Sequence, residues 1–348
     1  MEAIKIGNRV VGGGAPVFVI AEAGVNHNGE VELAKKLMDA AKKAGADAIK
    51  FQIFSAERLV VKMAPKAVYQ SRTTGKGTQY EMLKKLELTK EEFRKLAAYA
   101  RRKNIIFLAS AFDENGVELL DELRVSAFKV PSGEITNFPL LKQIARKRKP
   151  IILSTGMSTL GEIAEAMEVI RGEGANEIIL LHCVSDYPAK VEEINLRAMN
   201  TLKEAFGLPV GLSDHTPSLD IPIAAAALGA KIIEKHFTLN RKLPGPDQKA
   251  SLEPDELRKM IARIREVERA LGDGAKKPTK SEEILKKVVR RSIVARRDII
   301  KGTVITMEML DLKRPGTGLE PRYLEKVIGR KARIDIMADE LITFEKLA

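Results

Sequence analysis

Short apolar runs alternate with amphipathic segments from residue 16 to about residue 271. The apolar runs are hydrophobic on both faces, as strands of a buried parallel sheet are, and the segments between them have apolar residues at helical spacing. Strands are predicted at residues 17–22, 48–52, 105–110, 127–132, 151–155, 178–183, 210–213 and 232–236, and helices at 31–44, 90–103, 140–147, 160–171, 197–206, 219–228 and 254–271. Eight strands in about 250 residues predict a closed (β/α)8 TIM barrel, with a doubly wound open sheet as the alternative.

Further elements flank the predicted barrel. Residues 4–11 are predicted to form an N-terminal hairpin element that turns at Gly12, Gly13 and Gly14. After residue 271 the composition changes to Gly, Lys and Pro, which predicts a linker at 272–286. Residues 287–348 contain short predicted strands at 292–295 and 341–344 between turn signals, so they are expected to form a small β-rich domain. The predicted domains are therefore 1–271, 272–286 and 287–348.

Polar side chains lie toward the C-terminal end of nearly every predicted strand. In a barrel of this kind the active site occupies the C-terminal rim of the strands, so the pattern predicts one site around one mouth. The polar residues concerned are Glu22, Lys50, Gln52, Ser110, Lys129, Ser132, Ser154, His182, Ser213, His215, Glu234 and His236.

The two lysines of this set lie on apolar strands, where an unpaired ammonium group is costly. Each needs an anionic partner, which is either a neighbouring glutamate or a bound phosphate or carboxylate. The hydroxyls of Ser132, Ser154 and Ser213 and the glycines beside the first two favour a site for an anion.

His215 and His236 end the last two strands, which are neighbours in a closed barrel. Two imidazoles with oxygen ligands suit Mn²⁺, with Mg²⁺ or Co²⁺ as alternatives, and Glu134 and Asp247 lie on nearby loops. His182 could be a third ligand or a core residue, and this choice stays open.

Composition narrows the possible functions. The chain has 348 residues, a formal net charge of +12 and no Trp. Its basic residues are interleaved with acidic ones on predicted helix faces, which favours a solvated surface over a nucleic-acid groove. Cys183 is the only cysteine, so an intramolecular disulfide and a cysteine zinc site are excluded. No apolar run is long enough for a membrane span and the first residues lack a secretion signal, so we expect a cytoplasmic protein.

Several motifs keep a fixed order along the whole chain. They are AEAGVNHNG at 21–29, KFQ at 50–52, KVPSGE at 129–134, LSTGM at 153–157, LHC at 181–183, GLSDH at 211–215 and GPD at 245–247. Because it carries these motifs in this order, the chain resembles the sialic acid synthase family, which comprises N-acetylneuraminate synthase and related nonulosonic acid synthases. The resemblance implies a barrel followed by an antifreeze-like (SAF) domain, in a domain-swapped homodimer.

The resemblance also implies a transferase that condenses phosphoenolpyruvate with N-acetylmannosamine or a related N-acylated hexose. His215 and His236 would hold the metal, and Glu22 would be a general acid or base. Phosphoenolpyruvate would be bound by Lys50, Ser110, Lys129, Ser132, Ser154 and Ser213. The sugar would be bound by Gln52, Glu134, Tyr187, Asp247 and, from the partner subunit, Arg314.

Three positions depart from patterns common in that family: Ala111, Ser185 and Gln248. They leave the sugar open, so a legionaminate or pseudaminate synthase using a diacetamido hexose is an alternative. A phosphoenolpyruvate aldol synthase that makes a shorter phosphorylated sugar acid is disfavoured by the presence of the C-terminal domain. A barrel that binds without catalysis is disfavoured by the intact set of charged residues.

Overall fold

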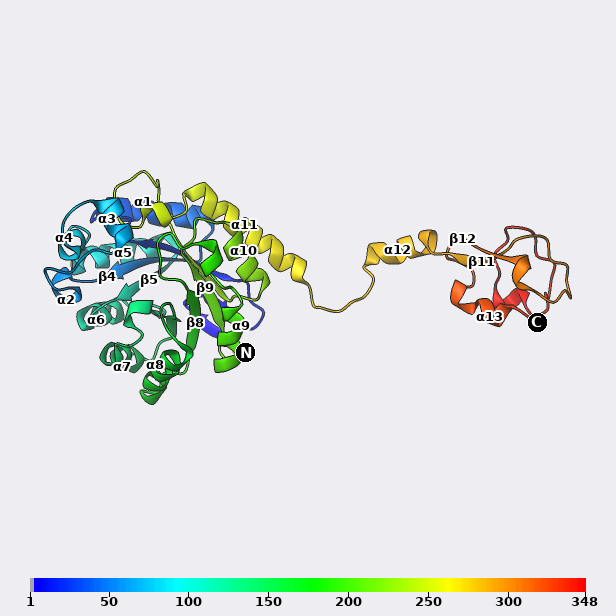
Figure 1. The fold of residues 1–348 in the computed structure, drawn as a ribbon, viewed down its shortest axis with the longest axis horizontal. Coiled ribbons are helices and arrows are strands. Elements are labelled where there is room, and N and C mark those ends of the chain that lie inside the picture. Colours follow the sequence, from blue (N-terminus) through cyan, green and yellow to red (C-terminus); the bar gives the residue numbers. More distant parts are fainter. Residues whose placement is uncertain (1–2) are drawn as a thin grey trace. The chain divides into compact units, whose positions relative to one another are not determined.

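The computed structural model describes residues 3–348 and divides them into two compact units. One unit ends at Gly272 and the other spans Asp273–Ala348 (Figure 1). This boundary lies at the start of the segment that the sequence predicts to be a linker.

The first unit is built on a closed barrel of parallel strands in the order β10-β3-β4-β5-β6-β7-β8-β9. The TIM barrel prediction is confirmed, and the open sheet is excluded because β10 pairs with both β9 and β3. The strands are β3 (Phe18–Gly24), β4 (Ala48–Ile53), β5 (Ile106–Ala111), β6 (Phe128–Val130), β7 (Ile151–Ser154), β8 (Ile178–Cys183), β9 (Val210–Asp214) and β10 (Ile232–His236).

Helices surround these strands on the outside of the barrel (Figure 1). They are α1 (Val31–Ala44), α5 (Lys90–Lys103), α6 (Glu114–Glu122), α7 (Phe138–Arg146), α8 (Leu160–Gly172), α9 (Ala198–Phe206), α10 (Asp220–Ala227) and α11 (Pro254–Leu271). Capping boxes begin α5 at Thr89 and α8 at Thr159, where the threonine hydroxyl accepts from a backbone amide and a glutamate three residues on accepts in return. The apolar faces of these helices and the outward residues of the strands form one continuous core.

The barrel interior is filled by a second apolar cluster at its N-terminal end. The antiparallel pair β1 (Ile4–Ile6) and β2 (Arg9–Val11) contributes Ile4, Ile6 and Val11 to this cluster. The predicted hairpin therefore closes the bottom of the barrel, but its turn lies at Gly7 and Asn8 and not at the three glycines. Gly7 has a φ of 60°, which a glycine adopts without strain.

The periodicity did not predict several short elements. Three helices between β4 and α5, namely α2 (Ala56–Leu59), α3 (Val68–Thr74) and α4 (Gln79–Lys84), are too short to give a clear helical period. Nor did it predict helix α6, although Asp113 accepts a hydrogen bond from the Gly116 amide as a typical N-cap. Strand β6 ends at Val130, because Ser132–Glu134 forms a 3-10 helix (η1). The sequence predicts a strand that continues to residue 132.

The second unit packs around its own small core, to which Ile293, Leu310, Val327 and Ile342 contribute. Its elements are α12 (Lys280–Val289), β11 (Ser292–Ala295), η4 (Met307–Met309), β12 (Leu310–Lys313), η5 (Pro321–Tyr323), α13 (Leu324–Val327) and η6 (Phe344–Lys346). The predicted linker thus contains most of a helix. The predicted strand at 341–344 is wrong, because Leu341 makes only an isolated bridge to Val294. No helix among residues 3–348 is long and apolar enough to cross a membrane.

Candidate active site

A cavity of about 460 Å³ opens at the C-terminal rim of the barrel strands. The polar residues that line it include Glu22, Lys50, Gln52, Ser110, Lys129, Ser132, Ser154, Tyr187, Ser213, His215, Glu234, His236 and Asp247. All the residues predicted for the site are in this lining except Glu134 and Arg314. The cavity therefore brings together side chains from every strand of the barrel or from the loop that follows it.

Strand alternation explains why these residues share one cavity. Side chains two apart on a strand point to the same side, so Glu22 follows the interior residue Ile20, and Lys50 follows Ala48. Strand register then fixes the neighbours across the barrel wall. Glu22 pairs with Lys50 on one side and with His236 on the other, so a carboxylate stands between an ammonium group and an imidazole.

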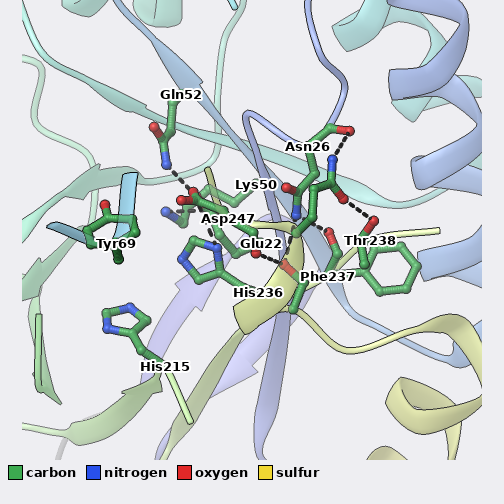
Figure 2. A network of polar contacts seen from close by, with 12 residues as sticks. Glu22, Asn26, Lys50, Gln52, Tyr69, His215, His236, Phe237, Thr238 and Asp247 are labelled. Carbon is green, nitrogen blue, oxygen red and sulfur yellow. Dashed lines mark hydrogen bonds and ion pairs between the residues drawn. The ribbon is translucent and has the colours of Figure 1, made fainter. Parts of the chain in front are cut away.

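Lys50 lies at the centre of the charged cluster. Its Nζ is 2.9 Å from Oε2 of Glu22 and 3.5 Å from Oε1 of Glu234, and it donates to Oγ of Ser110 at 3.2 Å. Gln52 donates to the other oxygen of Glu22 at 3.1 Å (Figure 2). The structure thus supplies the carboxylate partner for Lys50 that the sequence left open.

Lys129 and Glu234 form the second half of the cluster. Nζ of Lys129 donates to Oγ of Ser154 at 2.8 Å and is 3.7 Å from Oε1 of Glu234. That oxygen also accepts from Ser213 at 3.0 Å, while the other oxygen of Glu234 has no hydrogen-bond partner among the described residues. Glu234 was among the rim residues but was given no role in the predicted site, although its position two residues before His236, on the same face of the strand, was a usable signal.

The two buried glutamates have opposite pKa shifts. Burial, together with the charge of Glu234, raises the pKa of Glu22 to about 7 despite the neighbouring Lys50. Burial also acts to raise the pKa of Glu234, but Lys129 and Lys50 outweigh it and hold that pKa below its usual value. Glu234 is therefore the permanent carboxylate near pH 7, whereas Glu22 can gain or lose a proton there, as a general acid or base must.

Small polar groups form the floor of the cavity beside Lys129. The Gly156 amide donates to Oγ of Ser132 at 3.0 Å, and that hydroxyl lies 3.1 Å from the Cys183 sulfur. A Cβ at Gly156 would come within 2.4 Å of the Ser185 hydroxyl oxygen and within 2.8 Å of the Cys183 sulfur. A side chain at this position would displace these groups, so packing favours glycine at this place in the LSTGM motif.

The two predicted metal histidines stand side by side with ring centroids 5.3 Å apart (Figure 2). Nδ1 of His215 is 2.6 Å from the Val184 carbonyl oxygen, and because a carbonyl only accepts, Nδ1 must carry the proton. Nε2 of His215 then has a lone pair, and the Ser213 hydroxyl oxygen, which donates to Glu234, lies 3.4 Å from it. Nδ1 of His236 is buried without a hydrogen-bond partner in the described chain, and Asp247 Oδ2 is 3.7 Å away.

These groups fit the donor set expected for a divalent ion. Burial lowers the pKa of His215 to about 4, and burial and the nearby His215 lower the pKa of His236, so both imidazoles are neutral near pH 7. A metal binds the neutral imidazole. Residues 3–348 contain no group of three or more His, Cys, Asp or Glu side chains arranged around a metal position, so further ligands would have to come from water or substrate.

One wall of the cavity is aromatic and apolar. The Tyr187 ring lies 4.2 Å from the His215 ring and 5.2 Å from the Tyr69 ring, measured between centroids. Beyond Tyr69 the lining is mostly hydrophobic and includes Val25, Met82, Leu83, Leu86 and Phe112. Most of these side chains come from or pack around α4, one of the helices that the sequence did not predict. The cavity is thus charged at its floor and apolar on this side.

Four residues considered from sequence lie outside this cavity. Glu134 accepts from Asn137 at 2.7 Å, and Arg314 belongs to the second unit, where it is exposed. His182 is 2.6 Å from the Ile194 carbonyl oxygen, so it has a structural partner away from the lining residues. The Gln248 side chain is fully buried and donates to the Asn26 carbonyl, so the family departure at this position does not itself contact the cavity.

The fold and the site together define a class of protein. It is a TIM barrel with a buried cluster of acidic, basic and cationic side chains at its C-terminal rim. The model of the NeuB family matches residues 37–276, and that of the SAF domain matches residues 290–348. The chain therefore belongs to the NeuB family, and it carries a SAF domain after its barrel.

The chain is similar to several named proteins over nearly its whole length. The chain is 50% identical to the N,N'-diacetyllegionaminic acid synthase of Campylobacter jejuni, over 93% of this chain and 98% of that protein. It is 45% identical to the enzyme of the same name from Legionella pneumophila, over 95% of this chain and 94% of that protein. A solved structure of an N-acetylneuraminic acid synthetase from Leptospira borgpetersenii has a TM-score of 0.73 at 37% identity and covers 82% of this chain and 95% of its own.

Proposed function

We propose that this chain condenses phosphoenolpyruvate with an N-acylated hexose and water to give a nine-carbon 2-keto sugar acid and phosphate. One observation carries the proposal. Lys50, Lys129 and Glu234 form a cluster in the same cavity as the pair His215 and His236. The two groups are neighbours, because the Ser213 hydroxyl contacts both Glu234 and His215. The first group suits a small molecule with phosphate and carboxylate groups, and the second suits a metal that holds an aldehyde.

Phosphoenolpyruvate would bind at the lysine side of the cavity. The two ammonium groups, with the hydroxyls of Ser110, Ser132, Ser154 and Ser213, offer charge-assisted and neutral hydrogen bonds to its phosphate and carboxylate. With both glutamates ionised, the cluster of two lysines and two glutamates has no net charge. Protonation of Glu22, whose pKa is about 7, leaves one positive charge to receive the anion.

The sugar would bind above the histidines. His215 and His236 would hold the divalent ion, for which we propose Mn²⁺. The ion would polarise the aldehyde oxygen of the open-chain sugar. Tyr187, Gln52 and Asp247 line this part of the cavity and would orient the sugar. Burial raises the pKa of Asp247 to about 6, so its carboxyl group is mostly ionised at pH 7 and can accept hydrogen bonds from sugar hydroxyls.

The reaction forms one carbon–carbon bond and breaks one carbon–oxygen bond. Carbon 3 of phosphoenolpyruvate attacks the aldehyde carbon, and the resulting alkoxide takes up a proton. Water adds at carbon 2 and gives up one proton. The resulting hydroxyl gives up the second proton as phosphate leaves with the bridging oxygen and takes up a proton, which yields the 2-keto group. Glu22, which can exchange a proton near pH 7, would serve one of these proton transfers.

The apolar wall favours a doubly acylated sugar as acceptor. A second acetamido group brings an additional methyl, and the side chains of Val25, Met82, Leu86 and Phe112 provide an apolar surface for it. The two relatives named as diacetyllegionaminic acid synthases, at 50% and 45% identity, support the same choice. We therefore propose a 2,4-diacetamido hexose over N-acetylmannosamine as the acceptor.

A substrate panel tests this choice. Purified chain with phosphoenolpyruvate and Mn²⁺ is expected to release phosphate with a 2,4-diacetamido hexose at a kcat/KM at least about tenfold above that with N-acetylmannosamine, since apolar groups of this size are worth about 1–3 kcal/mol in a pocket. N-acetylmannosamine 6-phosphate is the third member of the panel. A preference for either N-acetylmannosamine compound would contradict the acceptor assignment, and no phosphate release with any sugar would favour a non-catalytic barrel.

We also propose that the active form is a homodimer in which the SAF domain of one chain serves the barrel of the other. In the described chain, helix α12 exposes the apolar side chains of Ile284, Leu285 and Val288, the first of them to 72%. An apolar stripe of this kind supports an interface. Arg314 is exposed and makes no ion pair among residues 3–348, so it is free to act on the partner's site.

Arg314→Ala is expected to raise the KM for the sugar about tenfold or more with little change in the KM for phosphoenolpyruvate. The reason is that Arg314 of the partner subunit would contact the N-acyl end of the sugar and would not contact phosphoenolpyruvate. Steady-state kinetics with each substrate varied in turn measures both constants. Arg297→Ala removes another exposed arginine of the same unit and is the matched control. An unchanged sugar KM in the Arg314 variant would exclude the capping role.

A further inference from the structure

Behind the two histidines lies an ion pair that the proposed chemistry does not use. Strands β9 and β10 pair Asp214 with Lys235, one residue further along than the pair Ser213 and Glu234 that faces the cavity. Strand alternation turns Asp214 and Lys235 to the opposite side of the barrel wall, and neither lines the cavity. Lys235 is 0% exposed and Asp214 is 1% exposed.

The contacts of Lys235 enclose the backbone of His215. Its Nζ donates to Oδ2 of Asp214 at 2.5 Å, just before His215, and also to the carbonyl oxygen of Thr216, just after it. The Asp214 carboxylate in turn accepts from the Thr216 amide at 2.9 Å and from the Thr216 hydroxyl at 3.0 Å. The turn that carries His215 is thus tied on both sides to one ammonium group.

The same ammonium group belongs to the residue that precedes His236. The His236 ring nitrogen Nδ1 has no hydrogen-bond partner in the described chain, so its backbone and its packing must set the position of the ring. His215 has a second restraint, because its Nδ1 donates to the Val184 carbonyl. A link between the backbones on either side of the two rings is therefore a link between the rings.

The energetics of buried ion pairs favour a positioning role over a stabilising one. Removing two charges from water costs free energy that their attraction only roughly repays, so such a pair adds little stability compared with apolar residues of the same size. What it does supply is a fixed arrangement, because each charge restricts the position of the other. A fixed spacing of the two imidazoles is what a metal with two protein ligands needs.

We propose that Asp214 and Lys235 are positioning residues that set the distance and orientation between the rings of His215 and His236. This inference rests on the proposed role of the histidines as metal ligands. It assigns a task to the middle residue of each of the two His-terminated motifs, Ser-Asp-His and Glu-Lys-His, whose outer residues all face the cavity.

The test uses a double variant, Asp214→Asn with Lys235→Met, which leaves no unpaired buried charge and is therefore expected to fold. The chain has four histidines, so histidine-selective ¹⁵N labelling gives a spectrum with few signals. In the full chain without metal, the ring signals of His215 and His236 should shift while those of His27 and His182 stay in place. Mn²⁺ affinity, measured by titration, should fall at least tenfold, with a smaller change in phosphoenolpyruvate affinity.

Asp47→Asn is the matched control, because Asp47 is a buried carboxylate at the N-terminal end of the strands, where it accepts from the Val19 amide and pairs with Arg265. It should lower the melting temperature without moving the His215 and His236 signals or the Mn²⁺ affinity. Unshifted signals of both rings in the folded double variant would overturn the inference. Failure of the parent chain to bind Mn²⁺ would instead overturn the metal assignment, and the ring signals would still decide the positioning role.

Discussion

Glu22→Gln is expected to lower kcat by about 10²-fold or more, the usual loss when a general acid or base is removed. The glutamine keeps the size of the side chain and resembles the protonated carboxyl group, which is accessible near pH 7 because burial raises the pKa of Glu22 to about 7. The variant should therefore fold, with the interaction to Gln52 retained. Phosphate release at saturating substrates measures the loss.

The pH dependence of kcat/KM gives a second test of the role of Glu22 with the same variant. In the parent chain, kcat/KM should bend near pH 7 as Glu22 titrates, and the bend should be absent from Glu22→Gln. A rate that falls below pH 7 would identify Glu22 as a base, and a rate that falls above pH 7 would identify it as an acid. Glu268→Gln is the control, because Glu268 on α11 accepts a hydrogen bond from the Val17 amide at the opposite, N-terminal end of the barrel. Near-normal turnover of Glu22→Gln would remove Glu22 from the mechanism.

His215→Ala and His236→Ala are each expected to weaken Mn²⁺ binding about 10²-fold or more, because each removes one of only two imidazoles at the proposed metal position. Both rings are neutral near pH 7, since burial lowers the pKa of each, so no proton has to be displaced for the metal to bind. Isothermal titration with Mn²⁺ measures the affinity directly and does not depend on turnover.

His182→Ala is the matched control for this pair. His182 is on the neighbouring strand β8, but its ring is bonded to the Ile194 carbonyl and does not line the cavity. Its removal should leave Mn²⁺ affinity unchanged. Equal Mn²⁺ affinity in the parent and in both His215→Ala and His236→Ala would show that the metal assignment is wrong.

The barrel was predictable because its strands are buried on both faces and its longer helices are amphipathic. Helices α1 and α5 begin and end where the apolar spacing predicts. The short helices α2 to α4 were not predictable in this way, since four to seven residues cannot show a 3.6-residue period. These helices matter for the proposed choice of acceptor, because α4 contributes to the apolar wall of the cavity.

Most of the site could be predicted because a residue type at a strand end fixes its place at the rim. The sequence could not show which charges pair, and so it left the partner of Lys50 open and gave Glu234 no role. Glu134 lies on the predicted loop, but its carboxylate accepts a hydrogen bond from Asn137 and it is not among the lining residues, so its contact with the sugar stays a prediction. The role predicted for Arg314 is in the site of a partner subunit, so it stays a prediction.

The most direct test of the proposed reaction is one incubation with phosphoenolpyruvate labelled with ¹⁸O at the bridging oxygen, together with the acceptor sugar and Mn²⁺. The proposed condensation predicts that phosphate appears in equal amount to a nine-carbon 2-keto acid and that this phosphate carries the ¹⁸O label, since the bond between carbon 2 and oxygen is the one that breaks. Phosphate without the label, or phosphate without the sugar acid, would contradict it.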